Sequence, residues 1–420
     1  MAYRQVFDSM ACGLDQAAWQ AIGDSLEPVA DATAERLEAC DLPALSVARR
    51  KDDLDMLAAR AGDIAGSSRD VLVLGIGGSS LGGQTLLALR DARHADRPNL
   101  HFIDNVDPVT WHETLAGLDA KDVHVLAVSK SGGTAETLAQ TLIATAHLDE
   151  ALGSAQAAAQ VTVVTEPGDR PLRRLAERLG CVVIDHDPDV GGRFSALTGV
   201  GLLPVLIAGL DGAAVRDGAA SVLASFADDP VTSAPADGAA LAVGLGHRGK
   251  TSQVVLSYAD RLERFAAWHA QIWAESLGKE GKGTTPVPAR GVTDQHSQLQ
   301  LWLDGPRDKW VTVLGRDTAG EGPVIDTAGD DDLDYLAGRT LGDLMAAEHE
   351  ATVESLVAAD VPLRRFRLDR IDEAAIGALM AHFMLETILA AGLIGIDPFG
   401  QPAVEDGKVR ARARLKAMAP

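Results

Sequence analysis

Two glycine-rich segments have the composition of a phosphate-binding site, and each directly follows a run of β-branched residues. The first is GIGGSSLGG at 75–83, and the second is SKSGGTAET at 129–137. Loops of this kind expose backbone N–H groups at the start of a helix, where a bound anion is favoured. In the second segment Ser129, Ser131 and Thr134 add hydroxyl donors. Capping of a helix by Thr134 would not by itself require three hydroxyls and two glycines, so we predict a phosphate site here.

The spacing in the first segment argues against a nucleotide. Ser80 stands where the third glycine of the dinucleotide motif G-x-G-x-x-G is needed, and Gln84 stands where a P-loop requires lysine. For this loop taken alone, a tight turn without a ligand remains the alternative. We therefore expect a small phosphorylated ligand.

Short β-branched runs alternate with helical patterns, which predicts an α/β fold with doubly wound parallel sheets and ligands at the carboxyl ends of the strands. The first series of expected strands is 71–75, 100–104, 122–129, 160–165 and 181–185. The second series is 252–258, 310–315 and 361–368, with helical patterns at 259–277 and 370–393. We expect two domains, 1–215 and 216–420, that meet in the Ala/Gly/Asp-rich stretch 211–237. Each would be an α/β/α sandwich, and a helical tail would end the chain.

Composition limits the partners and the compartment. The formal net charge of −22 disfavours nucleic acid and anionic membranes. The uncharged run 194–210 is close to membrane-spanning length, but Pro204 interrupts it and no second candidate is present, so we predict one helix buried in a core. Cys12, Cys40 and Cys181 form no C-x-x-C pair, and the N-terminus lacks a secretory pattern. These features predict a cytoplasmic protein, and no histidine spacing indicates a metal site.

Further motifs follow the two loops in the chain. They are GGRFSAL at 191–197, ESLGK at 275–279, DQHS at 294–297 and the segment 395–408, which begins GIDPF and ends VEDGK. Together with the loops, this order resembles the glucose-6-phosphate isomerase family, which is built from sugar isomerase domains. The resemblance implies reversible aldose–ketose isomerisation of glucose 6-phosphate and fructose 6-phosphate through a cis-enediol, in glycolysis and gluconeogenesis. It also implies no cofactor and a homodimer with a shared active site.

Isomerisation moves a proton between C1 and C2, which requires a base above both carbons. By resemblance this base is Glu275, and Gln271, four residues earlier, projects from the same helical face. Arg193 is expected to stabilise the enediolate, because a guanidinium stays cationic and presents several donors. The resemblance further makes His296 the ring-opening residue, delivered by the neighbouring subunit, and gives Lys408 a role at the ring oxygen O5.

The expected substrate contacts combine the two loops with the helix and the C-terminal segment. They are Gly78, Ser79, Ser129, Lys130, Ser131, Thr134, Gln271 and Gln401. The sequence departs from the family pattern in two places: Gly400 stands where relatives often have aspartate, and Gly132-Gly133 stands where many have bulkier or hydroxyl residues.

Two alternatives to this function stay open at this point. A non-catalytic sugar-phosphate sensor would need only the phosphate loops, and it usually carries a DNA-binding module, of which no basic helix-turn-helix segment is evident. A related enzyme could act on mannose 6-phosphate or an amino sugar phosphate. An amidotransferase would need an N-terminal nucleophilic cysteine, and the context of Cys12 is unremarkable.

Overall fold

The first sheet is parallel throughout and has the strand order β3-β2-β4-β5-β6. The computed structural model describes residues 2–7 and 13–418, so Cys12 lies outside the described residues. The strands of this sheet are β2 (Asp70–Leu74), β3 (Asn99–Ile103), β4 (Val123–Val128), β5 (Val161–Thr165) and β6 (Val182–Asp185). All five coincide within a residue or two with strands predicted from the sequence.

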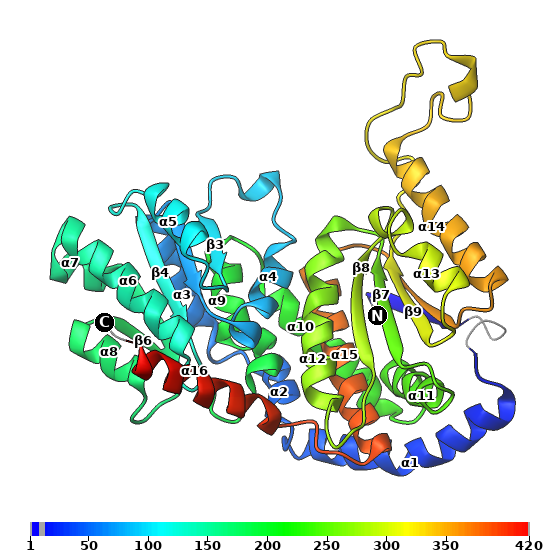
Figure 1. Cartoon of the computed structure of the whole chain (residues 1–420), viewed down its shortest axis with the longest axis horizontal. Helices are drawn as coiled ribbons and strands as arrows, with labels where there is room; N and C mark the ends of the chain where they lie inside the picture. Colours follow the sequence, from blue (N-terminus) through cyan, green and yellow to red (C-terminus); the bar gives the residue numbers. More distant parts are fainter. Residues whose placement is uncertain (1, 8–12, 419–420) are drawn as a thin grey trace.

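Helices cover both faces of this sheet (Figure 1), which explains why its strands are apolar on both sides. Alternate residues of β2 face opposite layers: Val71 and Val73 belong to one apolar cluster, and Leu72 and Leu74 belong to another. The first cluster includes residues of α3 (Leu54–Ser67), α4 (Leu81–Leu87) and α9 (Gly199–Ile207). The second includes residues of α6 (Ala135–Leu152), α7 (Ser154–Ala159) and α8 (Pro171–Leu179), with α5 (Pro108–Ala116) packed against it.

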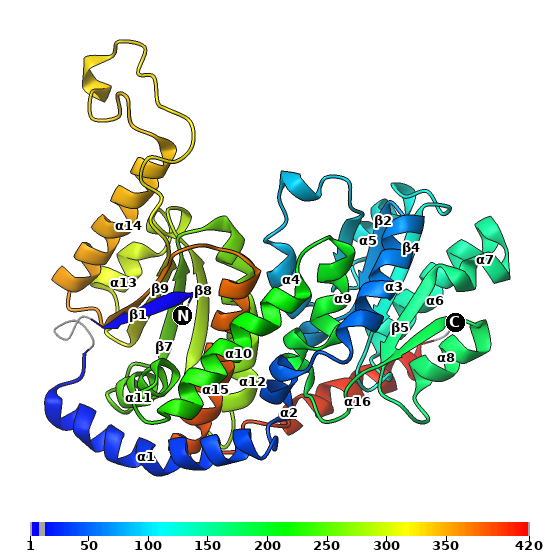
Figure 2. The same cartoon turned by 180° about the vertical axis from the view of Figure 1, so that it is seen from behind.

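The second sheet has the order β1-β10-β9-β7-β8, and only its edge strand β1 is antiparallel (Figure 2). Its strands are β1 (Tyr3–Phe7), β7 (Ser252–Ser257), β8 (Thr285–Arg290), β9 (Lys309–Gly315) and β10 (Leu363–Leu368). The three strands predicted in this half are confirmed, whereas β1 and β8 were not predicted. A division of the chain at 215/216 separates the strands of the two sheets with one exception. The exception is β1, which lies at the N-terminal end of the sequence but pairs with β10 in the second sheet.

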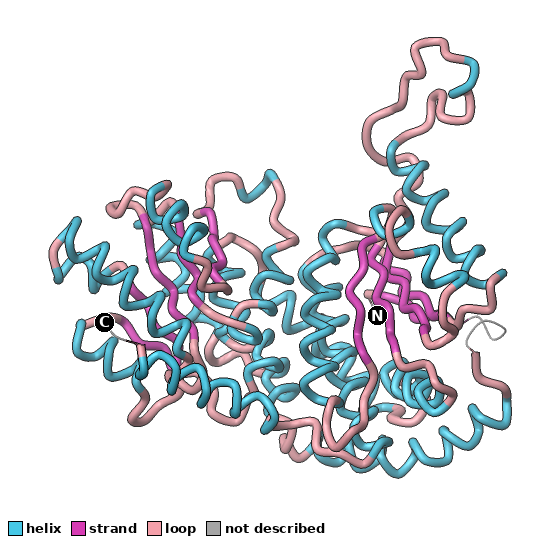
Figure 3. The backbone as a smooth tube through the Cα atoms, in the orientation of Figure 1, coloured by secondary structure: helices cyan, strands magenta, loops and turns pink. Residues whose placement is uncertain are grey.

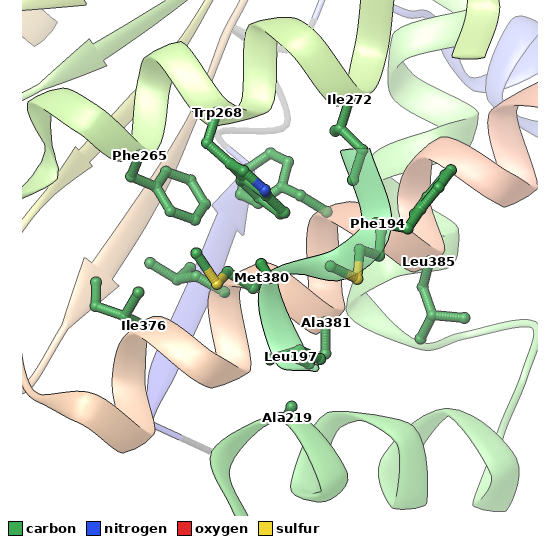
Figure 4. Packing of buried hydrophobic residues seen from close by; sticks show 14 of the residues in the cluster. Phe194, Leu197, Ala219, Phe265, Trp268, Ile272, Ile376, Met380, Ala381 and Leu385 are labelled. Carbon is green, nitrogen blue, oxygen red and sulfur yellow. The ribbon is translucent and has the colours of Figure 1, made fainter. Parts of the chain in front are cut away.

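Helices α10, α12 and α15 stand between the two sheets (Figure 1). The remaining helices are α1 (Gln16–Glu38), α2 (Pro43–Ser46), α10 (Gly212–Asp228), α11 (Ala234–His247), α12 (Glu263–Leu277), α13 (Leu299–Asp304), α14 (Leu341–Ala358), α15 (Glu373–Ile394) and α16 (Glu405–Ala417). One apolar cluster joins the halves: Phe194 and Leu197 pack with Trp268 of α12 and Met380 of α15 (Figure 4). The stretch 211–237, expected to separate the domains, instead forms α10 and the first turn of α11.

Two predictions about apolar segments need correction. The run 194–210 is not one helix: a 3-10 turn, Gly192–Leu197, is followed by Thr198, whose side chain caps α9. The expectation that the chain holds no second membrane candidate was also wrong, because α15 is long and apolar enough to cross a membrane by length and composition. In the structure, 94% of its apolar window is buried, as in the core helix of a soluble protein.

Two segments are largely exposed. Residues 316–340, between β9 and α14, form a long and largely exposed loop (Figure 3). Every residue of α16 is exposed. The predicted C-terminal helical tail is therefore present, and no residue of it is buried within the chain.

Candidate active site

The two glycine-rich loops leave neighbouring strands at the point where the strand order reverses. Strands β2 and β4 are adjacent, with Leu74 opposite Ala127 in the register, and β3 lies on the other side of β2. Adjacent strands are about 5 Å apart, so the loops that begin at Gly75 and Ser129 start side by side. In an open α/β sheet this switch point is where ligands bind.

The hydroxyls of the second loop contact one another. Ser129 Oγ lies 2.9 Å from Thr134 Oγ1, and Ser131 Oγ accepts a 3.2 Å hydrogen bond from the backbone N–H of Gly133. Thr134 is the N-cap residue of α6, but its side chain makes no capping hydrogen bond. Helix capping therefore does not account for this hydroxyl, and the loop presents polar groups at the N-terminus of an 18-residue helix.

The Lys130 side chain points away from these hydroxyls. Its ammonium donates to Pro188 O at 2.8 Å and lies 3.4 Å from Glu166 Oε1. The structure thus places Lys130 as a support of the loop, and does not bring its charge to the predicted phosphate position. At Gly132 a Cβ atom would lie 2.8 Å from Arg170 Cβ, which accounts for glycine at this departure from the family pattern.

The first loop packs closely on the segment that carries Arg193. Gly78 lies in a 3-10 turn, Gly77–Ser79, and an added Cβ atom would stand 2.2 Å from the carbonyl of Gly192. Real Cβ atoms do not approach backbone so closely, so glycine is required for this contact. Ser195 Oγ also donates to Gly78 O at 3.2 Å. Ser79 ends the turn beside this contact and is half-buried.

The predicted base lies on the last turn of α12. Gln271 Nε2 donates to Glu275 Oε1 at 2.9 Å, which confirms that both side chains share one face. Arg193 Nη1 lies 3.3 Å from Glu275 Oε2. The Glu275 side chain is 31% exposed and that of Arg193 is 3% exposed, so a substrate can reach the carboxylate while the guanidinium is fixed behind it.

Arg193 is held by further acceptors on α12 and on the segment 398–401. Its Nε donates to Ser276 Oγ at 2.8 Å, Nη1 donates to Gln401 Oε1 at 2.6 Å, and Nη2 donates to the carbonyl oxygens of Pro398 and Gly400. Burial lowers the pKa of Arg193 from its ordinary value of 12.5, and the charge of Glu275 opposes this. The group remains a cation at neutral pH, as stabilisation of an enediolate requires.

His296 and Lys408 do not join this group within one chain. Arg290, which contacts Thr293 near His296, pairs with Glu263 at the start of α12 at 3.2 Å. Glu275 is twelve residues further along the same helix, about 18 Å at 1.5 Å per residue, so the contact of Arg290 lies at the opposite end of α12, and the His296 side chain itself is exposed. Lys408 is exposed on α16, where its ammonium contacts Glu405 at 2.6 Å.

Two residues that contact the site were not predicted as site residues. Ser276 accepts from Arg193, and the Lys279 ammonium donates to Asp397 O at 2.6 Å and Phe399 O at 2.8 Å. Both belong to the ESLGK motif at 275–279, and the motif was their only signal. Among residues 2–7 and 13–418, no group of three His, Cys, Asp or Glu side chains is arranged to hold a metal ion.

Comparisons with known proteins agree on one family. A family model described as phosphoglucose isomerase matches residues 51–290. A glucose-6-phosphate isomerase of Rubrobacter xylanophilus is 41% identical over 360 residues, which cover 82% of each chain. The crystal structure of a hypothetical protein from Thermus thermophilus matches with a TM-score of 0.88 and 33% identity, over 98% of this chain and 100% of the other. That of a glucose-6-phosphate isomerase from Chlamydia trachomatis has a TM-score of 0.79 at 20% identity, over 99% and 89% of the two chains, and shows the same fold.

Proposed function

This chain belongs to the phosphoglucose isomerase family and interconverts glucose 6-phosphate and fructose 6-phosphate, and we propose that Glu275 is the base of this reaction. The single observation that carries the assignment is the contact between a reachable carboxylate and a buried guanidinium, Glu275 and Arg193, at 3.3 Å. This pair meets the first glycine-rich loop through Gly78. A base and a fixed cation beside a phosphate loop are what an enediolate intermediate needs.

The substrate phosphate binds to the second loop. Ser129, Ser131 and Thr134 donate to its oxygens, together with backbone N–H groups at the start of α6. This remote contact holds C1 and C2 in line with the carboxylate, so that binding energy from the phosphate contributes to turnover. Ser79 and Gly78 form the side of the pocket that faces Arg193.

The proton transfer uses both oxygens of one carboxylate. Glu275 removes the proton from C2 of open-chain glucose 6-phosphate, and the electrons of that C–H bond form the enediolate. Arg193 faces the developing negative charge. As the hydroxyl proton of O2 passes to O1, the protonated carboxyl returns its proton to C1, which leaves the carbonyl at C2, gives fructose 6-phosphate and restores the carboxylate. Gln271 donates to Oε1 and Arg193 to Oε2, so both oxygens are oriented for this exchange.

Ring opening depends on His296 from a second subunit in this proposal. His296 is exposed, and Arg290 near it contacts α12 at Glu263, at the opposite end of the helix from Glu275, which supports delivery by a partner. The exposed loop 316–340 and the fully exposed α16 are further surfaces that a second copy would cover. Lys408 assists at O5, and Gln401 closes over the sugar. We place the homodimer in the cytoplasm, where it serves glycolysis and gluconeogenesis.

Mixing two inactive variants tests the shared site. One variant carries His296→Ala and the other carries Glu275→Gln. In a two-fold dimer with shared sites, each heterodimer of one subunit from each variant retains one site with both native residues. Random reassortment should therefore restore about a quarter of the wild-type activity. If His296 instead served its own chain, no site of the mixture would be intact and activity would stay at the level of the separate variants.

A coupled assay tests the reaction itself. Purified protein with EDTA receives fructose 6-phosphate, and a glucose-6-phosphate dehydrogenase reports the product. We expect turnover without added metal. No product, or a strict need for metal, would overturn the proposed function.

A further inference from the structure

Three cations surround one turn between α15 and α16. Lys282 Nζ donates to Ile394 O at 3.0 Å and to Gly395 O at 3.5 Å, where α15 ends. Lys279 Nζ donates to the next carbonyls, Asp397 O and Phe399 O, at 2.6 and 2.8 Å. Arg193 donates to the carbonyls of Pro398 and Gly400. The turn 394–400 thus directs six carbonyl oxygens at these three side chains.

The turn leads directly to Gln401, whose side-chain oxygen accepts from Arg193 at 2.6 Å. Lys279 is four residues after Glu275, just beyond the Gly278 that ends α12. Arg193 and Lys279 therefore attach the same turn to the same helix end from two sides. Arg193 uses Ser276 as its contact there, and Lys279 is itself part of that segment. Two crosslinks fix the position of one segment against another far better than one.

We propose that Lys279 is a positioning residue for the isomerase reaction, which holds the turn 397–401 against the end of α12 so that Arg193 faces Glu275. This inference rests on the proposed function. Without the Lys279 ammonium, Asp397 O and Phe399 O lose their donor, and of the three cations only Arg193 still donates to residues 397–401, since Lys282 donates to Ile394 O and Gly395 O. Arg193 then follows the carbonyls of Pro398 and Gly400 as they shift, and its distance from Glu275 changes. A displacement of about 1 Å in a catalytic contact lowers turnover by up to about a hundredfold.

The phosphate loop provides a contrast within the same enzyme. Its hydroxyls at Ser129 and Thr134 contact each other, and the Lys279 ammonium donates to the turn instead. Loss of the Lys279 charge should therefore reduce kcat and leave the affinity for the phosphate end intact. Loss of a lysine that is merely structural would lower stability without a selective fall in kcat at unchanged KM.

The test is Lys279→Met, with Lys250→Met as the matched control. The Lys250 ammonium also donates to a distant carbonyl, Arg307 O at 2.7 Å, and burial lowers its pKa as it does that of Lys279. We expect kcat of Lys279→Met to fall by about ten- to a hundredfold with KM within about threefold, while Lys250→Met keeps wild-type kinetics. Lys279→Arg should recover most of kcat, because a guanidinium can donate to both carbonyls.

Hydrogen exchange gives a readout that does not depend on activity. The Phe399 amide donates to Asp397 Oδ1 at 2.9 Å within the turn, so its protection should fall in Lys279→Met and not in Lys250→Met. Unchanged exchange with kcat within twofold of wild type would overturn the proposal. If Lys279→Met does not fold, the Lys279→Arg variant provides the test. A hundredfold loss of kcat in Lys279→Arg, while the Phe399 amide stays protected, would also overturn the positioning role of Lys279. A wild-type protein without isomerase activity would refute the proposed function, and the exchange experiment would still test the turn.

Discussion

Replacement of Glu275 by glutamine tests the central assignment, because it changes the chemistry of the site with almost no change in shape. The amide oxygen introduced at this position can still accept from Gln271, which in the native protein donates to Glu275 at 2.9 Å. Arg193 loses its 3.3 Å contact with a carboxylate but keeps Ser276, Gln401 and two backbone carbonyls as acceptors. The guanidinium should therefore stay in place, and the variant lacks only the base.

The expected magnitude follows from this geometry. General base catalysis contributes about 10²- to 10⁴-fold, which corresponds to roughly 3–5.5 kcal/mol of transition-state stabilisation. We expect kcat to fall by that factor. The phosphate loop at 129–134 belongs to a different element, so KM should change by less than about threefold. Because the Glu275 side chain is 31% exposed, loss of its ion pair should cost at most about 1 kcal/mol of folding free energy.

Two assays and one control separate the base from other roles. The coupled assay gives kcat and KM, and NMR in D₂O measures exchange of the C2 hydrogen of glucose 6-phosphate, which should be lost together with turnover. The control is Glu263→Gln, at the other end of α12, which also removes a carboxylate 3.2 Å from an arginine. If Glu275→Gln retains more than a tenth of wild-type kcat, or Glu263→Gln loses as much, Glu275 is not the base.

Two further predictions concern stability. Burial, and then the charge of Asp229, raise the pKa of Asp237 to about 6 from 3.8, so between these pH values the native state binds more protons than the unfolded state and loses stability as pH rises. Asp237→Asn should therefore be more stable than wild type by about 1–2 kcal/mol at pH 7.5 and equal to it at pH 4. Thermal unfolding that shows no gain at pH 7.5 would contradict this. Glu386 holds the fully buried Arg364 through contacts of 2.7 and 2.8 Å, so Glu386→Ala should lower the free energy of unfolding by about 3–5 kcal/mol in urea titrations, and a loss below about 1 kcal/mol would show that Arg364 finds another partner.

The parts of the fold that local patterns encode were predictable from the sequence. Of the eight predicted strands, five are almost entirely buried and have a strand on each side, namely β2, β4, β5, β7 and β9. Strand β8 was not predicted because Pro286 and Pro288 argue against a strand. The two prolines are tolerated here because β8 lies at the edge of the sheet. Strand β1 was not predicted because its partner β10 is far away in the sequence. The stretch 211–237 was misjudged because small residues that suit a loop also suit closely packed helices.

The site divides in the same way. Hydroxyls and glycines at 129–134 indicated a phosphate loop from composition alone. The contact between Arg193 and Glu275 joins residues far apart in the chain, and only the resemblance to a family predicted it. The proposed contribution of His296 requires a second chain, which no pattern within one sequence describes. Lys279 was overlooked because its partners are backbone carbonyls, and these leave no trace in side-chain identity.

The antiparallel edge strand has a consequence for biosynthesis. Tyr3 leaves the ribosome long before its register partner, Leu368. At 5–20 residues per second, the N-terminal segment must wait roughly 20 to 70 seconds for that partner to emerge. The first sheet can form during this interval, since its strands all lie between Asp70 and Asp185. The nascent protein can therefore complete one half while β1 remains unpaired, and β1 and β10 can pair only after Leu368 has emerged.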